Sequence, residues 1–257
     1  MHPTFGAAHP AARLRREPRE SPTAYDGAVT PALSISDVLD SLGTRGSPSA
    51  PPPSRTPFEW VLYEIASYLV PDERRLEVHR RLEREVGLTP DAILKASQAK
   101  LVAAVADGGM RPDMRAARIR EAARIAKEIG DLSRAARAPL AEAVKTFSRF
   151  PAIGAPGAEK ILLFAGKRAV PALESNGLRV LERLGFAPGG RSYAATYRAV
   201  REALLSGGER DPEFWQRAHL ALRRHGQEVC RRTAPICRSC PLVASCPTGR
   251  SEGGRRT

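Results

Sequence analysis

Four cysteines near the C-terminal end of the chain could bind a metal. Cys230, Cys237, Cys240 and Cys246 are the only cysteines in the sequence, and their spacing is C-x6-C-x2-C-x5-C. Thiolate sulfurs from one short segment are typical ligands of zinc or of an iron–sulfur cluster. Two disulfides are disfavoured, because we find no secretory signal and 257 residues exceed the small scaffolds that need such cross-links. Zinc ribbons usually carry two C-x2-C pairs and this segment has one, but the spacing alone leaves both metals open.

A second segment could bind a phosphate. Residues 150–157 read Phe-Pro-Ala-Ile-Gly-Ala-Pro-Gly and lie between two stretches of helical periodicity. The pattern predicts a helix, a tight turn and another helix, whose N-terminal N–H groups would suit a phosphate oxygen. Gly154 and Gly157 would allow the phosphate to approach closely. Many helical proteins turn on proline and glycine, so the segment alone leaves a plain turn open.

Together these segments resemble the endonuclease III family of helix-hairpin-helix DNA glycosylases. The cysteine segment is similar to the C-terminal cluster loop of that family, including His225-Gly226 before the first cysteine. The hairpin matches the family pattern at Phe150, Pro151, Ile153, Gly154 and Ala158, while Ala152 replaces the first glycine. The resemblance covers roughly residues 57–247. It implies a [4Fe-4S] cluster on the four cysteines and contacts of Ile153, Gly154 and Gly157 with DNA.

The resemblance also implies a catalytic carboxylate. Residues 171–180 are similar to the segment that holds the catalytic aspartate of the family, and Glu174 falls on that position. A carboxylate there can stabilise a cationic sugar during base excision. The extra methylene of glutamate moves the carboxylate by roughly 1 Å, a shift that can change the rate on the order of 10²-fold. The alternative is that Glu174 is only an acidic residue at a helix N-terminus.

A nucleophilic lysine is not found where the lyase branch of the family carries one. That position is Pro156, which has no amine, so strand cleavage through a Schiff base is not expected from it. Lys160 lies one helical turn further and could replace it, although such a lysine more often contacts phosphate or water. We therefore expect a monofunctional enzyme, with a glycosylase/lyase that uses Lys160 as an alternative.

Two more pairs of residues are implied as DNA contacts. Leu69 falls on the position of the residue that fills the space of a flipped-out nucleotide, and Tyr68 is beside it. Two apolar residues at a helix end are more often part of a core. Arg231 and Arg232, between the first two cysteines, match the basic part of the cluster loop that contacts the DNA backbone.

The composition is consistent with a nucleic-acid partner. The formal net charge is +13 and the sequence pI about 10.3, which favours a polyanionic partner. No apolar run approaches 18 residues, so no membrane span is expected. Thiolate ligands imply a reducing compartment. We expect a monomer in the cytoplasm, associated with the nucleoid, or in the nucleus or an organelle of a eukaryote.

Helical periodicity dominates the chain after a polar N-terminal segment. Residues 1–54 are rich in Pro, Ala, Arg and Ser, which predicts a disordered tail and linker. Within it, Ile35, Val38, Leu39 and Leu42 follow helical spacing, and a transient helix without a role is favoured over one that docks on a partner. The rest is expected to be all-α. Helices are predicted at 58–69, 76–86, 90–108, 112–129, 139–147, 158–165, 193–205 and 213–228.

The resemblance implies a two-domain architecture with a DNA-binding cleft. Residues 55–76 would form a first helix that packs with the C-terminal cluster domain, and residues 77–173 a six-helix barrel domain with the hairpin. Residues 174–248 would form the helical cluster domain and 249–257 a basic tail. The implied function is hydrolysis of the N-glycosidic bond of a damaged or mismatched base in double-stranded DNA. A non-catalytic protein that binds distorted DNA on the same scaffold is the alternative.

Overall fold

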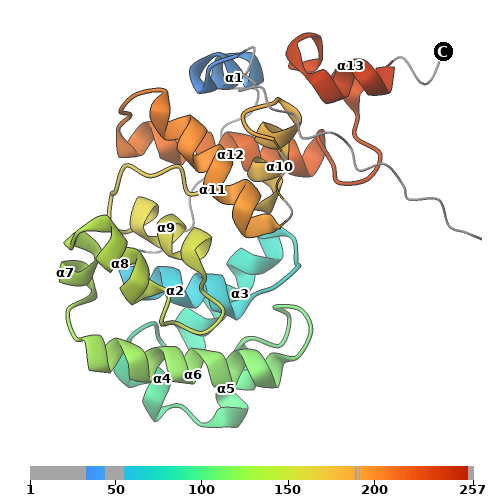
Figure 1. The fold of residues 1–257 in the computed structure, drawn as a ribbon. Helices are drawn as coiled ribbons and strands as arrows, with labels where there is room; N and C mark the ends of the chain where they lie inside the picture. The colour runs from blue at the N-terminus through green and yellow to red at the C-terminus, as the bar shows by residue number, and fades with distance from the viewer. Residues whose placement is uncertain (1–32, 44–54, 189, 191, 254–257) are drawn as a thin grey trace, which may run out of the picture.

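A computed structural model describes residues 33–43, 55–188, 190 and 192–253. These residues form helices and connecting loops with no strand among them, which confirms the all-α prediction (Figure 1). Two 3-10 turns, Cys237–Ser239 and Val243–Ser245, lie in the cysteine segment. The α-helices are α1 (Ile35–Leu42), α2 (Pro57–Ala66), α3 (Asp72–Glu85), α4 (Pro90–Lys95), α5 (Gln98–Ala104), α6 (Pro112–Ile129), α7 (Leu132–Arg137), α8 (Leu140–Phe147), α9 (Ala155–Phe164), α10 (Ser175–Arg183), α11 (Tyr193–Ser206), α12 (Pro212–Glu228) and α13 (Pro247–Gly253).

Capping residues explain where many helices begin. Thr89 accepts a hydrogen bond from the Ala92 N–H before α4, and Asp211 accepts one from Phe214 before α12. Each such cap stabilises a helix by about 1 kcal/mol. The predicted helix 90–108 is divided into α4 and α5, because Ser97 caps a new helix with its own side chain. Helix α7 was not predicted from the sequence, and Asp131 caps it in the same way.

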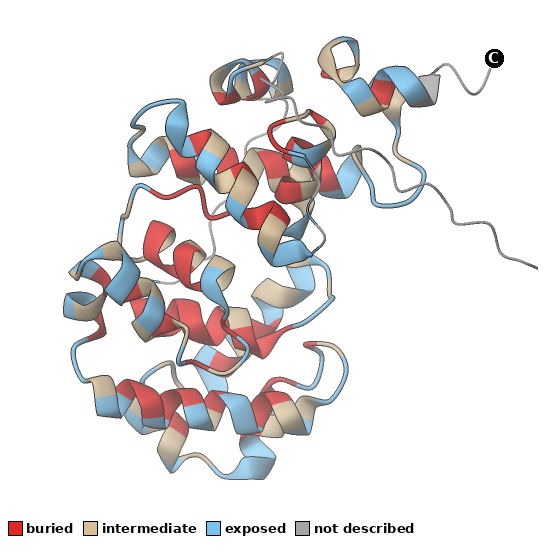
Figure 2. Cartoon of the chain, in the orientation of Figure 1, coloured by how far each residue is buried: buried red, intermediate tan, exposed pale blue. Residues whose placement is uncertain are grey.

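Two hydrophobic clusters divide the helices into two units. The first unit contains α2 to α9 around buried residues such as Leu62, Ile119 and Phe147. The second contains α1 and α10 to α12 around Leu181 and Trp215, and α13 lies against α10. Leu140 and Phe164 are partly buried against both clusters. Figure 1 shows the second unit above the first with α9 between them, and Figure 2 shows buried faces of α2, α6 and α12 turned inward.

Helix α2 lies in a different unit from the one expected. Nearly all of its residues are buried, and it packs against α6, α3 and α9 of the first unit. The position of α2 thus differs from the expectation that residues 55–76 pack with the C-terminal cluster domain, although Asp72 on α3 pairs with Arg223 on α12. The physical reason is that α2 is apolar on several faces, so the surrounding helices of the first unit enclose it.

Helix α1 is ordered, although residues 35–42 fell within the predicted disordered segment. Ser34 and Asp37 form a capping box, and Ile35 and Val38 are buried in the second unit, where α1 contacts α12. The prediction of a transient helix without a docking site thus differs from the structure. Residues 1–32 and 44–54 of the predicted tail and linker lie outside the described residues. Residues 254–257 of the predicted basic tail also lie outside them. None of the described helices has the length and low charge needed to cross a bilayer.

Candidate active site and candidate metal centre

The four cysteines surround one cavity in the second unit. All four are free thiols rather than disulfides. Cys230 follows the end of α12, Cys237 and Cys240 bound the first 3-10 turn, and Cys246 follows the second. The cavity is also lined by Arg183, Val229, Pro235, Val243, Thr248 and Gly249. The fold therefore brings together the four residues that the sequence proposed as ligands.

Polar groups lie within hydrogen-bonding distance of the Cys230, Cys240 and Cys246 sulfurs. The Arg183 guanidinium donates to Cys230 Sγ at 3.3 Å, the Gly249 N–H donates to Cys246 Sγ at 3.3 Å, and His225 Nε2 lies 3.5 Å from Cys240 Sγ. Burial raises the pKa of the Cys240 thiol, and the neighbouring cysteines add to that effect. A bound metal centre would reverse it, because its positive charge favours thiolates.

The two candidate metals make different demands on the arrangement of the sulfurs. Four thiolates on one zinc ion stand about 3.8 Å apart, given Zn–S bonds of about 2.3 Å. In the described residues, no three His, Cys, Asp or Glu side chains are grouped closely enough to hold a single ion. Sulfurs that surround a cavity suit a polynuclear cluster, in which each sulfur binds a different metal atom. A cavity lined by four cysteines is compatible with an iron–sulfur cluster.

Glu174 is the N-cap residue of α10, at the start of the second unit. Its Oε1 accepts a hydrogen bond of 2.6 Å from the Gly177 N–H, and its Oε2 accepts one of 2.9 Å from the Asn176 side chain. The helix-terminal interpretation of Glu174 is thus correct as a description of its contacts. The same contacts fix the direction of the half-buried carboxylate, so they are compatible with a catalytic role.

A chain of hydrogen bonds connects Glu174 with the cysteine segment. Asn176, which donates to Glu174, accepts at its Oδ1 a bond of 2.9 Å from Arg179. Arg179 also donates to the carbonyl oxygens of Cys230 at 3.0 Å and Gly226 at 2.7 Å. Gly226 is required here, because a Cβ would lie 2.6 Å from the Asn176 carbonyl oxygen. The carboxylate and the cavity are therefore parts of one rigid assembly of α10 and α12.

Lys160 lies in a buried ion pair. Its Nζ is 2.7 Å from Glu64 Oε1 on α2, and an Arg75 nitrogen lies 3.7 Å from the same oxygen. Burial alone would raise the pKa of Glu64, but Lys160 and Arg75 outweigh it and hold that pKa below its ordinary value. Lys160 is thus held by a carboxylate that the sequence analysis did not identify, and only the tertiary packing of α2 against α9 reveals it.

The predicted hairpin is present between α8 and α9. Ile153 is buried and its N–H donates to the Phe150 carbonyl. Ala152 adopts the left-handed conformation with φ 62°, which is the conformation that the family glycine at this position would take without strain. Gly154 precedes α9 without any side-chain cap, and its φ is −92°. A Cβ there would meet only Pro156 Cδ at 3.8 Å.

Packing therefore gives no reason for glycine at position 154, while an approaching phosphate would. The first-turn N–H groups of α9 have no acceptor within their own helix, and those of Ala155 and Gly157 remain for a ligand. A Cβ on Gly157 would make only ordinary contacts with Ile153, the shorter of them 3.4 Å. The structure thus places Ile153, Gly154 and Gly157 together at this helix N-terminus.

Three large apolar side chains are exposed on two adjacent loops. Tyr68, Leu69 and Met110 are 63%, 79% and 75% exposed. The loop of Tyr68 and Leu69 lies against the loop 105–111, because the Tyr68 N–H donates to the Gly108 carbonyl at 2.8 Å. Leu69 has φ 55°, a strained conformation for leucine. The core interpretation of Tyr68 and Leu69 is wrong, since their side chains face the solvent.

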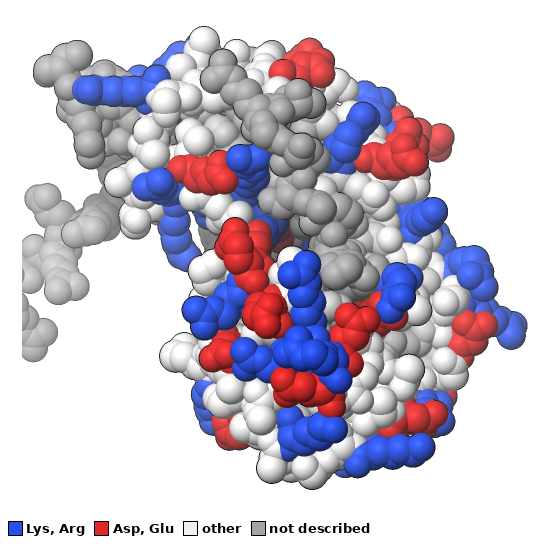
Figure 3. All heavy atoms as spheres, turned by 180° about the vertical axis from the view of Figure 1, so that it is seen from behind, with Lys and Arg blue, Asp and Glu red and all other residues white. Residues whose placement is uncertain are grey.

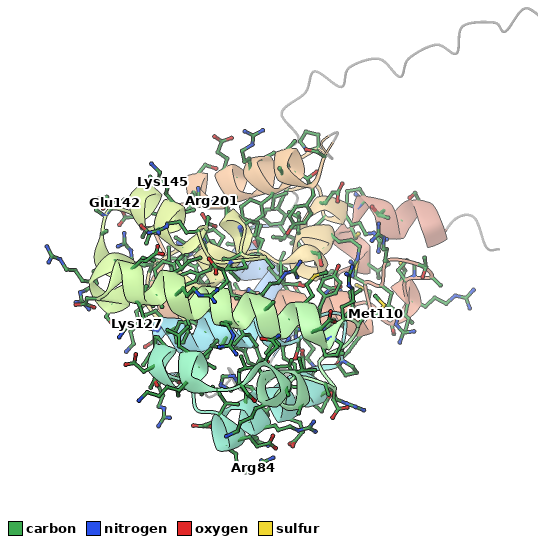
Figure 4. The ribbon with its side chains drawn as sticks, turned by 90° about the horizontal axis from the view of Figure 1, so that it is seen from below. Arg84, Met110, Lys127, Glu142, Lys145 and Arg201 are labelled. Carbon is green, nitrogen blue, oxygen red and sulfur yellow. The ribbon has the colours of Figure 1, made fainter. Side chains whose placement is uncertain are left out.

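Met110 is the exposed residue that the sequence analysis missed. Figure 4 shows it at the edge of the molecule beside the start of α6. Buried Arg115 fixes its loop by donating to the carbonyl oxygens of Val105 at 2.9 Å, Gly109 at 2.7 Å and Met110. The Gly108-Gly109 pair followed by a methionine was the signal that could have revealed it. We call Tyr68, Leu69 and Met110 the apolar tip.

The basic residues Arg231 and Arg232 are exposed on the loop between the first two cysteines. Arg183 holds this loop by donating to the carbonyl oxygens of Arg231 at 2.8 Å and Arg232 at 3.2 Å. On the face opposite to the view of Figure 1, positive and negative side chains are intermingled, so that face does not favour a polyanion (Figure 3).

Comparison with known proteins gives structural matches only. No protein-family model matches the sequence, and no curated protein matches it. A trapped endonuclease III–DNA covalent intermediate is similar with a TM-score of 0.68 and 22% identity, covering 86% of this chain and 99% of that one. A thermostable thymine-DNA glycosylase has a TM-score of 0.65 and 17% identity, covering 84% and 95%.

A 3-methyladenine DNA glycosylase of H. pylori, bound to 1,N6-ethenoadenine, has a TM-score of 0.58 and 18% identity, covering 76% of this chain and 98% of that one. Each match covers nearly the whole length of the solved structure, so the similarity includes both helical units. The chain therefore has the fold of the helix-hairpin-helix DNA glycosylases, as its motifs predicted.

Proposed function

We propose that the chain is a base-excision-repair DNA N-glycosylase that hydrolyses the bond between a damaged or mismatched base and its deoxyribose. The observation that carries the proposal is the position of Glu174. Its carboxylate is fixed at the start of α10, where the second helical unit begins. The shared fold with three DNA glycosylases supports this function.

Binding would use three surfaces that the fold holds rigid. The N-terminus of α9, with the N–H groups of Ala155 and Gly157, binds a backbone phosphate. The apolar tip enters the base stack and fills the space of the flipped nucleotide, since exposed apolar side chains unstack bases. Arg231 and Arg232 contact the DNA backbone beyond the lesion. We expect a monomer to bind the DNA, in the nucleoid or in a nucleus or organelle.

The chemical step would be hydrolysis rather than lyase chemistry. As the glycosidic bond breaks, positive charge develops on the sugar, and the Glu174 carboxylate stabilises it. Water then bonds to the sugar carbon, and its proton passes to Glu174. Pro156 has no amine, and the Lys160 amine is an ammonium paired with Glu64, so its lone pair is not free to attack the sugar.

We further propose that Cys230, Cys237, Cys240 and Cys246 hold a [4Fe-4S] cluster. When bound, the cluster would cross-link the cysteine segment and so fix its loop. This loop carries Arg231 and Arg232, and Arg179 joins it to the helix that begins after Glu174. The cluster would thus support DNA binding and the position of the carboxylate together. Iron and acid-labile sulfide in stoichiometric amounts would support it, and zinc in their place would contradict it.

Base release from a panel of duplexes tests the proposed activity. The panel contains oxidised, deaminated, alkylated and mismatched bases, and the expected result is release of at least one of them. Glu174→Gln should lower single-turnover release by roughly 10²-fold or more while the affinity for DNA remains. If the parent binds distorted duplexes but releases no base from the panel, the non-catalytic binding protein is the correct function.

The salt dependence of DNA binding tests the basic loop. Each lost phosphate contact lowers the slope of log affinity against log salt by about one. Arg231→Ala and Arg232→Ala should each show this change. Arg124→Ala is the matched control, because Arg124 is exposed on α6 and pairs with Glu121. A slope that is unchanged in all three variants would show that Arg231 and Arg232 face only solvent.

A further inference from the structure

The ion pair of Lys160 and Glu64 is buried, and a buried ion pair contributes little to the stability of a fold. The two side chains are only 13% and 12% exposed, and they connect α9 with α2. A buried ion pair costs desolvation that its attraction barely repays, and apolar residues of similar volume often stabilise a protein more. A pair retained in such a place is a candidate for a functional role.

Other ionisable groups of both units surround this pair. Arg75 lies beside Glu64, and Asp72 on α3 forms a two-bond pair with Arg223 on α12, of which one bond is 2.6 Å. His219 on α12 is buried, and its Nδ1 lies 2.6 Å from the Ala172 carbonyl oxygen. Burial lowers the pKa of His219 to about 4, with Lys160 adding to the effect, so the imidazole is neutral at pH 7.

His219 also feels the negative charge of Glu174, which acts on its pKa in the opposite direction from Lys160. The carboxylate of Glu174 and the ammonium of Lys160 therefore act on the same neutral imidazole. One negative and one positive group thus lie around a single buried ring between the two units. This pattern matches the reaction, because breaking a glycosidic bond puts positive charge on the sugar and negative charge on the departing base.

We infer that Lys160 is a second catalytic residue, whose ammonium stabilises the departing base, and that Glu64 is the positioning residue that holds this ammonium in place. This inference rests on the proposed glycosylase function and deepens it. The bond between the sugar carbon and the base nitrogen breaks, and its electron pair leaves with the base. Lys160 donates a hydrogen bond to the ring nitrogen or carbonyl oxygen that carries the charge. Water supplies the new bond to the sugar, and the released base takes a proton from Lys160, which water restores.

The position of Lys160 along α9 assigns it to the base rather than to the sugar. The proposed phosphate contact is at the N-terminus of α9, around Gly154 and Gly157. Lys160 lies four residues beyond Pro156, which is about 6 Å along the helix axis. A flipped nucleotide keeps its phosphates at the surface, and its base enters the protein furthest. The mostly buried ammonium is therefore the group that the base would reach.

The dependence on the leaving group tests Lys160 without assuming which base is the substrate. Duplexes carry two probe pairs, uracil with 5-fluorouracil and hypoxanthine with 7-methylguanine, in which the second base of each pair leaves more easily. Lys160→Met should lower single-turnover release of the poorer leaving group by about 10²- to 10³-fold. The better leaving group of the same pair should lose about 10-fold or less. Lys160→Arg keeps a cationic donor and should recover part of the rate.

Glu64 is tested by the pH profile of base release. In Glu64→Gln the ammonium loses its nearest anion, while Arg75 remains beside it, so its positive charge is less stabilised. The groups that face it from the neighbouring helices are Glu64, Asp72, Arg75, His219 and Arg223. The rate of Glu64→Gln should therefore decline at a lower alkaline pH than that of the parent. A purely structural role of Glu64 would lower the rate equally at every pH.

A folding defect can be distinguished from a loss of catalysis in the same experiment. Lys160→Met leaves a buried carboxylate without its nearest partner, so the double variant Glu64→Gln/Lys160→Met is measured beside it to preserve folding. Equal losses for both members of a probe pair, in a parent that releases base, would overturn the role of Lys160 and leave the glycosylase intact. A parent that releases none of the panel bases would overturn both proposals. A borohydride-trapped adduct lost in Lys160→Met would show a nucleophile instead.

Discussion

Gly109 should be indispensable for the apolar tip, because it is where the two exposed loops touch. It has φ 106°, and a Cβ would lie 2.4 Å from the Tyr68 carbonyl oxygen. Gly109→Ala therefore has two costs. A side chain at positive φ costs roughly 1–2 kcal/mol, and the forced displacement of the Tyr68 loop costs about another 1–3 kcal/mol.

Gly130→Ala is the matched control for Gly109→Ala. Gly130 has φ 77°, and a Cβ there would meet nothing within 4 Å. Both variants place a side chain at positive φ and change the unfolded chain equally, so Gly109→Ala should cost about 1–3 kcal/mol more because of the contact between the loops. Urea unfolding measures it, and thermal unfolding should show roughly 2–4 °C per kcal/mol.

Affinity for DNA should also differ between Gly109→Ala and Gly130→Ala. Gly109→Ala moves Tyr68 and Leu69 away from Met110, so it should weaken binding to a duplex that contains a tetrahydrofuran abasic analogue. Gly130→Ala should bind this duplex like the parent. If the two variants lose equal stability and equal affinity, the loops are not held together through Gly109, and the apolar tip is not a rigid unit.

Three other changes test the hairpin, the buried histidine and the connection to the cysteines. Ala152→Gly should raise the free energy of unfolding by about 0.5–1 kcal/mol. The change removes roughly 1–2 kcal/mol of strain at φ 62°, and the greater entropy of the unfolded chain offsets about 0.4–1 kcal/mol of this gain. A lower urea midpoint would contradict this. His219 has a folded pKa of about 4 against 6.5, so between these values the unfolded chain binds more protons and stability falls as the pH falls. Between pH 6.5 and 4 the parent should lose about 3 kcal/mol in its free energy of unfolding relative to His219→Gln. A difference between the two proteins that does not change with pH would refute this. Arg179→Met leaves the carbonyl oxygens of Gly226 and Cys230 without their donor, at about 1–3 kcal/mol for each group that stays buried, and should lower both stability and iron content. Exposed Arg124→Met, which breaks an i,i+3 pair on α6, should change stability by no more than about 0.5 kcal/mol.

Local chemistry explains what could be predicted from the sequence. The starts of α4, α6 and α12 follow from Thr89, Pro112 and Asp211, because a cap and an N1 proline act within one helical turn. The convergence of the cysteines was predictable for the same reason, since all four belong to one short segment. Nothing beyond neighbouring residues is needed for either prediction.

Contacts between distant segments explain what could not be predicted. The place of α2 in the first unit depends on α6 and α9, which follow it by many residues. The pairing of Glu64 with Lys160 depends on the same packing, and so does the contact of the Tyr68 loop with Gly109. Hydrophobic periodicity reports that a helix has a buried face but not which helix covers it.

Two of the departures from the family pattern, Ala152 and Glu174, are accommodated by the local backbone. Ala152 keeps the left-handed turn that glycine would adopt, although this costs roughly 1–2 kcal/mol. Glu174 caps α10 with its longer side chain and keeps both oxygens hydrogen-bonded. Strained backbone of this kind is more often found at functional sites than elsewhere. The strained turn and the uncapped helix N-terminus are consistent with the phosphate contact proposed at the hairpin, and the fixed carboxylate is consistent with the proposed reaction.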